Sequence, residues 1–205
     1  MTRIHFVRHG MVHNPQGIFY GRLPGYSLSA EGWRQAEAGA QSLADRSIVA
    51  IYSSPMLRAR QTARAIASRH PGRRVRTSQN LNEVYVPIQG LPLAEGIARG
   101  WDLYTGNRPP YESIEDIFRR MLRFTQQMRQ RHFGQEIVAV THGDPIGFLM
   151  LWAQGRPVTA ENKAPLYQHY LAVGSITTLT FATAFTEERP ALEYTVPYTG
   201  PANPI

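Results

Sequence analysis

The stretch IHFVRHG, at residues 4–10, is a short apolar run that ends in an Arg, a His and a Gly. Similar runs occur as IVAIYSSPMLR at residues 48–58 and as IVAVTHG at residues 137–143. Short apolar runs bounded by turn residues predict buried strands. Because helical patterns separate these runs, the sequence favours a three-layer α/β/α sandwich with a largely parallel central sheet.

The remaining elements follow from hydrophobic periodicity and from turn residues. We expect strands at about residues 4–7, 48–52, 75–77, 136–140, 175–181 and 192–196. We expect helices at about residues 30–44, 56–69, 113–131 and 145–153, and a short helical piece near 93–100. Residues 11–28 are interpreted as a long loop, and residues 84–112 as an insertion over the active face. No linker divides the sequence, so we expect one domain over residues 1–205, with an irregular tail from residue 197.

Composition limits the function classes. The 205 residues include 22 Lys+Arg and 15 Asp+Glu, which gives a formal net charge of +7, and no Cys. The lack of Cys excludes disulfides, thiolate nucleophiles and thiolate metal sites. Neither a signal-peptide pattern nor a long apolar segment occurs, so we expect a cytoplasmic protein without a membrane partner. Patterns typical of nucleic-acid recognition are also missing, so we expect no nucleic-acid partner despite the basic charge.

The three polar clusters are predicted to lie together, because ligands bind at the carboxyl ends of the strands in sheets of this kind. His9 follows the first strand, and a neutral imidazole is a good nucleophile near pH 7. The forked guanidinium of Arg8 can bind phosphate oxygens, and Arg58 lies in the first turn of a helix, where anions are favoured. His142 follows the third strand. Each cluster alone is a weak signal, but together they indicate an anion-binding active site.

The segments that carry these residues resemble the histidine phosphatase superfamily, in the branch that includes phosphoglycerate mutases and related small-molecule phosphatases. The matching segments are VRHG at residues 7–10, LSAEGWRQA at 28–36, SSPMLRARQTA at 53–63, LNE at 81–83 and VTHG at 140–143. The resemblance extends from Ile4 to about Phe181. It implies a phosphoglycerate mutase-like fold and an enzyme that hydrolyses phosphoric monoesters.

The resemblance also implies roles for single residues. His9 would be the nucleophile that becomes phosphorylated, and Glu83 would protonate the leaving oxygen and then activate water. The expected catalytic and phosphate-binding partners are Arg8, Asn14, Arg58, His142 and Gly143. Three residues of the first long loop are further candidates for substrate contact, namely Tyr20, Gly21 and Arg22.

Two further positions concern the substrate preference and the choice of the acidic residue. Met11 stands where many relatives carry Glu, which we interpret as a difference in substrate preference. Asp144 is the nearest alternative to Glu83 as the acidic residue. Arginines and a histidine can neutralise phosphate oxygens without a metal, and no metal-ligand spacing such as HExxH occurs, so we expect neither a metal nor a cofactor.

The leading hypothesis is a metal-independent phosphatase that acts on a small phosphorylated metabolite through a phosphohistidine on His9. One alternative is a phosphoglycerate mutase, and another is a non-catalytic relative that binds a phospho-ligand. A homodimer is compatible with the resemblance. Other polar residues are interpreted as solvated: His70, His132 and His169, Arg60 and Arg64, and the helical arginines Arg119, Arg120, Arg123, Arg129 and Arg131.

Overall fold

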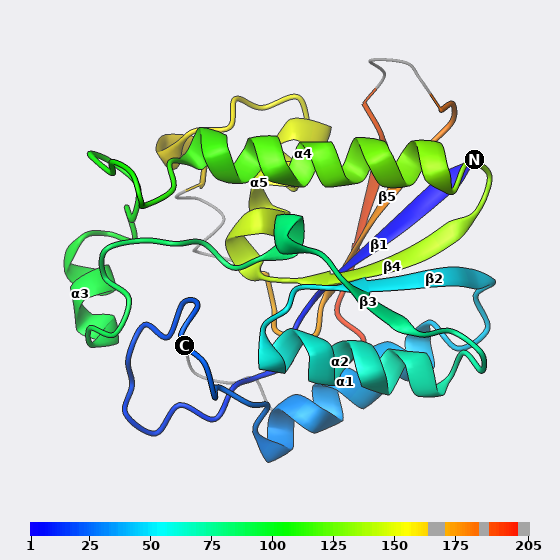
Figure 1. Ribbon diagram of the computed structural model, residues 1–205, viewed down its shortest axis with the longest axis horizontal. Helices are drawn as coiled ribbons and strands as arrows, with labels where there is room; N and C mark the ends of the chain where they lie inside the picture. The colour runs from blue at the N-terminus through cyan, green and yellow to red at the C-terminus, as the bar shows by residue number, and fades with distance from the viewer. Residues whose placement is uncertain (164–170, 185–188, 201–205) are drawn as a thin grey trace.

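The computed structural model describes residues 1–163, 171–184 and 189–200, and Figure 1 shows the arrangement of the elements. The strands are β1 (Thr2–Arg8), β2 (Ile48–Ser53), β3 (Val75–Thr77), β4 (Glu136–Thr141), β5 (Ile176–Phe181) and β6 (Ala191–Thr195). The helices are α1 (Ala30–Ser42), α2 (Leu57–Ser68), α3 (Leu93–Ala98), α4 (Ile114–Arg131) and α5 (Gly143–Ala153), with a short 3-10 turn η1 (Gln79–Leu81).

The six strands form one sheet in the order β3-β2-β4-β1-β5-β6. The pairs β3 with β2, β2 with β4 and β4 with β1 are parallel. β5 is antiparallel to β1, and β6 is antiparallel to β5. α4 and α5 cover one face of the sheet, and α1 and α2 cover the other (Figure 1). The predicted three-layer sandwich with a largely parallel sheet is therefore confirmed.

The alternation of side chains along β1 builds a core on each face of the sheet. Ile4 and Phe6 pack with Phe124 of α4 and Leu149 of α5. Val7 belongs to the opposite core, which it shares with small side chains of α1 and α2. Because helices cover both faces of the sheet, β1 places apolar side chains on both sides, and Ile4, Phe6 and Val7 are all buried.

Side-chain caps fix the starts of two helices. The Ser29 hydroxyl oxygen accepts a hydrogen bond from the Gly32 N–H at 3.0 Å and begins α1. Ser113 and Asp116 form a capping box at the start of α4. α5 begins at Gly143, two residues earlier than expected, so that His142 occupies the N-cap position. Among the described residues, no helix has the length and apolar character needed to cross a membrane.

The insertion at residues 84–112 has a core of its own. Val84, Val86 and Leu103 pack there with Phe148 of α5. The insertion carries α3, as the expected helical piece indicated, and it extends beyond the carboxyl end of the parallel strands (Figure 1).

Backbone hydrogen bonds join the first long loop to the insertion. The Phe19 N–H donates to the Leu91 carbonyl at 2.8 Å, and the Gly90 N–H donates to the Phe19 carbonyl at 2.8 Å. The two segments therefore form one wall beside the carboxyl end of the sheet.

Two histidines expected in solvent are buried instead. His132 is 8 % exposed, and its Nε2 lies 3.0 Å from the Tyr52 hydroxyl oxygen. His70 is buried at the end of α2. These two expectations were wrong because residues from distant parts of the chain contact the rings, Tyr52 in the case of His132 and the backbone of Leu43 in the case of His70. His169 lies outside the described residues.

Two arginines of α4 also differ from expectation. Arg129 is buried, and its guanidinium carbon lies 4.7 Å from the centroid of the Phe181 ring. Arg120 is partly buried and donates to the Asn82 carbonyl at 2.7 Å and to Glu112 at 2.8 Å. The predicted solvated face is thus wrong at these two positions, because segments far away in the sequence cover them. The other three arginines of α4, Arg119, Arg123 and Arg131, are exposed as expected.

Candidate active site

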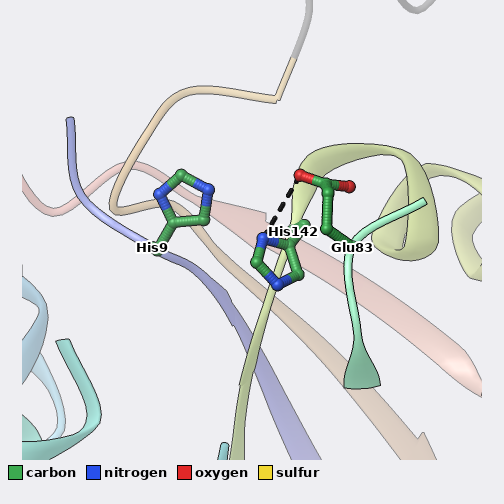
Figure 2. Close-up of side chains that lie close together, drawn as sticks. All are labelled: His9, Glu83 and His142. Atoms are coloured by element: carbon green, nitrogen blue, oxygen red, sulfur yellow. Dashed lines mark ion pairs between the residues drawn. The ribbon is translucent and has the colours of Figure 1, made fainter. Parts of the chain in front are cut away.

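Three side chains from separate segments meet at the carboxyl end of the sheet, as Figure 2 shows: His9 after β1, Glu83 after η1 and His142 after β4. The ring centroids of the two histidines are 5.0 Å apart, and Glu83 Oε2 lies 3.2 Å from His142 Nδ1. Arg8 and Thr141 are paired in the parallel register of β1 and β4. The next residue of each strand is a histidine, so the register itself brings the two rings together.

Arg58 joins all three of these side chains. It lies in the first turn of α2 and is 1 % exposed. Its Nε donates to His9 Nε2 at 3.1 Å, and its Nη2 lies 3.2 Å from His142 Nδ1 and 3.5 Å from Glu83 Oε2. Because a guanidinium stays protonated, the site holds a fixed positive charge.

Hydrogen bonds fix the tautomer of His9. Its Nδ1 lies 2.8 Å from the Gly10 carbonyl oxygen, which can only accept, so Nδ1 carries the proton and donates. Its Nε2 accepts from Arg58 Nε–H and therefore presents a lone pair. The lone pair of Nε2 thus faces the guanidinium and the other two side chains of the site.

The electrostatic environment keeps both histidines neutral. Burial, together with the charge of Arg58, lowers the pKa of His9 well below its ordinary value. Burial lowers the pKa of His142 to about 4, although the Glu83 carboxylate acts in the opposite direction. Burial raises the pKa of Glu83, but His142 and Arg58 outweigh this and hold it below its ordinary value. At pH 7 the site therefore combines two neutral imidazoles, one carboxylate and one guanidinium.

The loop that carries His9 is held by residues of the neighbouring helices. The Gly10 N–H donates to Thr62 Oγ1 of α2 at 3.2 Å, and the Met11 N–H donates to Gln35 Oε1 of α1 at 2.8 Å. A Cβ atom on Gly10 would lie 2.3 Å from the carbonyl oxygen of Gly32, so the loop and α1 approach too closely for any side chain here. Thr62 and Gln35 lie inside segments that matched the family, but sequence reasoning did not single them out.

Ser54 is another residue that sequence reasoning missed. Its hydroxyl oxygen lies 2.9 Å from His142 Nε2, and both side chains are fully buried. Since a hydroxyl can donate or accept, Ser54 supports either neutral tautomer of His142. The only sequence signal was its position directly after β2, at the same edge of the sheet.

Arg8 and Gly143 flank the two histidines. Arg8 is the last residue of β1, and its guanidinium donates to the Leu171 carbonyl. The positive charge of Arg8 also helps to lower the pKa of His9, after the larger effects of burial, Arg58 and His142. Gly143 is the buried first residue of α5, directly after His142.

The first long loop contacts Arg58 from the opposite side. The Gly21 carbonyl accepts from Arg58 Nη2 at 2.8 Å, and the Tyr20 ring centroid lies 4.7 Å from the guanidinium carbon. Gly21 has a φ of +42°, and a Cβ atom there would lie 2.6 Å from Gln89 Oε1. The predicted loop residues Tyr20 and Gly21 thus hold the guanidinium in place.

The other two predicted loop residues are engaged in the wall around the site. The Asn14 side chain closes its own loop, donating to the Ile18 carbonyl at 2.9 Å and accepting from the Ile18 N–H at 3.3 Å. Arg22 Nε donates to the Glu83 carbonyl at 2.7 Å, and Arg22 Nη2 lies 2.7 Å from Glu112 Oε2. Arg22 therefore ties the first loop to the backbone of the acidic residue and to the insertion.

Asp144, the alternative acidic residue, belongs to a different cluster. Its Oδ2 lies 2.5 Å from Lys163 Nζ and accepts a hydrogen bond from the Tyr104 hydroxyl. Lys163, the single lysine of the sequence, is 3 % exposed, and its Nζ lies 4.5 Å from the Tyr104 ring centroid. The carboxylate that contacts His142 and Arg58 is that of Glu83.

The ligand atoms of His9, Glu83 and His142 lie within 4.8 Å of one another, a spacing that can hold a metal ion. However, the Arg58 guanidinium contacts all three of these groups. A divalent cation would have to lie beside this buried positive charge, which is strongly unfavourable. The donor set therefore fits an anion better than a metal.

Comparisons with known proteins agree with this geometry. The family model of the histidine phosphatase superfamily, branch 1, matches residues 4–187. An uncharacterised protein of Mycobacterium tuberculosis is 42 % identical over 162 residues, which cover 76 % of this chain and 80 % of that protein. Phosphoserine phosphatase 1 of Hydrogenobacter thermophilus is 28 % identical over 156 residues, covering 71 % and 73 % of the two chains.

A solved structure extends the comparison to the fold. The mycobacterial glucosyl-3-phosphoglycerate phosphatase in complex with VO3 is 26 % identical and superposes with a TM-score of 0.75. The superposition covers 95 % of this chain and 97 % of that one. The predictions of family and of an enzyme are confirmed, because the family model spans most of the chain and the relatives include named phosphatases. The chain belongs to branch 1 of the histidine phosphatase superfamily.

Proposed function

We propose that this protein hydrolyses a small phosphomonoester without a metal ion, through a phosphohistidine on His9. The observation that carries this proposal is the state of His9: its Nδ1 donates to the Gly10 carbonyl, while its Nε2 lone pair faces the Arg58 guanidinium. A neutral imidazole with one nitrogen fixed as a donor has the other nitrogen available for attack on phosphorus.

The positive charges of the site bind the phosphoryl group. Arg58 supplies a buried guanidinium, and Arg8 adds a second one beside His9. When a phosphate binds, Arg58 exchanges its contacts with the two histidines for phosphate oxygens. Neutralising the phosphate oxygens and aligning phosphorus with Nε2 are the main demands of phosphoryl transfer.

In the first step, His9 Nε2 donates its electron pair to phosphorus, and the bond between phosphorus and the leaving oxygen breaks. The leaving oxygen keeps that electron pair and takes a proton from Glu83. Glu83 is ionised in the free protein, so it gains this proton on substrate binding. A phosphomonoester with a second pKa of about 6 can deliver the proton as a monoanion, and the negative charge of the bound phosphate favours the protonated carboxyl.

In the second step, a water molecule attacks the phosphohistidine. Glu83, now a carboxylate, takes a proton from this water while the phosphorus–nitrogen bond breaks and its electron pair returns to Nε2. Inorganic phosphate takes this proton from Glu83 and leaves as the monoanion, so that Glu83 is again a carboxylate and His9 is again free. His142 stabilises the charge on the phosphate oxygens as a hydrogen-bond donor, with Ser54 as the partner of its other nitrogen.

The proposed substrate is a small phosphorylated metabolite. The first loop and the insertion form the wall around the leaving-group side of the site, so these segments set the specificity. The names of two relatives, a phosphoserine phosphatase and a glucosyl-3-phosphoglycerate phosphatase, support this substrate class. We treat residues 1–205 as one functional domain, because the core of the insertion includes side chains of α4 and α5.

The test is phosphate release from a panel of phosphomonoesters in the presence of EDTA, with wild-type protein and His9→Ala. The panel includes p-nitrophenyl phosphate, phosphoserine and 3-phosphoglycerate. Release by the wild type alone is the expected result. No release from any compound contradicts the proposal; isomerisation of 3-phosphoglycerate would then indicate a mutase, and tight phosphate binding without turnover would indicate a binding protein.

A further inference from the structure

The positive charge of this protein is concentrated in one segment. Residues 46–82 contain eight Arg and no Asp or Glu, whereas the rest of the chain contains fourteen basic and fifteen acidic side chains. This segment forms β2, α2 and β3, with β3 at one edge of the sheet (Figure 1). The net charge of +7 therefore originates from this segment, of which Arg58 is buried in the site around His9.

A groove of about 440 Å³ opens between α2 and β3 in this segment. Its lining residues are Arg60, Arg64, Ala67, Arg74, Val75 and Thr77. Three guanidinium groups thus line the groove, and no carboxylate does. Within residues 1–163, 171–184 and 189–200, none of these arginines forms an ion pair, and the buried Nε of Arg60 has no hydrogen-bond partner.

The groove lies on the opposite side of α2 from the site around His9. Successive residues of an α-helix are about 100° apart, so Arg60 points about 200° away from Arg58. Arg58 and Thr62 are on the buried face of the helix, where they contact the loop of His9. Arg60 and Arg64 are one turn apart and share the outer face, which also faces Arg74 across the groove.

This arrangement is unfavourable without an anion. Like charges four residues apart destabilise a helix, and no acidic side chain lines the groove to offset the repulsion. A polyanion would relieve this repulsion and accept hydrogen bonds from the guanidinium groups. The groove lacks aromatic side chains, which are the stacking platforms of single-stranded nucleic-acid sites. The size of the groove and its three guanidinium groups instead fit a ligand that carries several negative charges over a short length.

We propose that this groove is a second anion site, which binds a compact polyanion with adjacent phosphate groups. Inorganic tripolyphosphate and the phosphate tail of a nucleoside triphosphate share this chemistry. The assignment does not depend on the proposed phosphatase activity, because none of the six lining residues belongs to the site around His9.

The test is calorimetric titration of the protein, residues 1–205, with inorganic tripolyphosphate at low ionic strength. The variant Arg64→Gln/Arg74→Gln removes two of the three guanidinium groups and should weaken binding about a hundredfold, because each guanidinium loses at least one charged hydrogen bond worth about one power of ten. The matched control is Arg123→Gln/Arg131→Gln, which removes two exposed arginines of α4. Both variants lose two positive charges, so the control measures the effect of net charge alone. Because its two arginines lie away from the groove, the control should change the affinity by less than about twofold.

Further arms separate this site from the catalytic pocket and identify the source of the anion. Arg58→Ala should leave a binding event of wild-type affinity, and AMP should bind at least about tenfold more weakly than tripolyphosphate or ATP. A higher affinity for ATP than for tripolyphosphate would indicate that the ligand is a nucleotide. Equal affinities would indicate that the groove recognises the phosphate chain alone. Equal weakening in both double variants, loss of all binding in Arg58→Ala, or AMP binding as tight as tripolyphosphate would overturn the proposal. The titration measures binding and not turnover. Its result can therefore be interpreted even if the proposed phosphatase function is wrong.

Discussion

Acidification should destabilise this protein through His142, and the size of the effect follows from its pKa. Burial lowers that pKa from its ordinary value of 6.5 to about 4 in the folded protein. Between these two values the unfolded chain binds a proton at His142 and the folded protein does not, so the free energy of unfolding falls as the pH falls. For one group with these two pKa values, the loss between pH 7.5 and pH 5.0 is about 2 kcal/mol.

The assay is urea unfolding of the wild type and of His142→Gln across this pH range. The wild type should lose about 2 kcal/mol more than the variant, because the variant lacks the titrating imidazole. Four other histidines with lowered pKa values also make the free energy of unfolding fall as the pH falls. They are present in both proteins, so their contributions cancel in the difference between the wild type and the variant. Parallel curves for the two proteins would refute the conclusion that His142 is held neutral.

Three more substitutions test other parts of the structure. Glu83→Gln should lower kcat about 10²–10⁴-fold on an alkyl phosphate and much less on p-nitrophenyl phosphate, whose leaving group needs no proton; steady-state kinetics that showed equal losses on both would contradict the role of Glu83 as the acid. A Cβ atom on Gly32 would lie 2.0 Å from the Met11 carbonyl oxygen, so Gly32→Ala should reduce turnover and cost about 1–3 kcal/mol in unfolding experiments. The control Gly39→Ala, whose nearest contact would be at 3.8 Å, should be neutral or stabilising, and equal effects of the two would be inconsistent with the close approach. Lys163→Met removes the cation beside the buried Asp144 and should cost about 3–5 kcal/mol, partly recovered by adding Asp144→Asn; a cost below about 1 kcal/mol in urea unfolding would argue against this buried ion pair.

The sheet and the central part of the site could be predicted because their signals are local. An apolar run that ends in a polar residue identifies a buried strand and its carboxyl end, and parallel strands bring such ends together. Once β1 and β4 are neighbours, the proximity of His9 and His142 requires no further information. Glu83 was expected from family resemblance, and the structure explains its position by a contact with His142.

The missed features depend on contacts between distant segments. Helical periodicity assigns Arg120 and Arg129 to an exposed face, but it contains no information about Asn82 or Phe181, which contact them. The pairing of Lys163 with Asp144 likewise joins two segments that no local pattern relates. Such contacts form only when loops close over the layered core, so they require the three-dimensional structure.

The support around His9 was missed for a different reason. Thr62 and Gln35 lie in segments that matched the family, yet each appears in the sequence as one polar residue of a helix. Their functions are visible only where their oxygens accept from the N–H groups of Gly10 and Met11. The conformation of the loop that carries His9 is thus fixed by side chains of two different helices, α1 and α2.

The central claim is that His9 carries the phosphoryl group during turnover. The most direct measurement is mass spectrometry of the protein after rapid mixing with p-nitrophenyl phosphate and alkaline quenching, which preserves phosphohistidine. We expect one phosphoryl group on the peptide that contains His9, and neither this modification nor turnover in His9→Ala. Phosphate release by the wild type without a phosphorylated His9, or sustained turnover by His9→Ala, would contradict it.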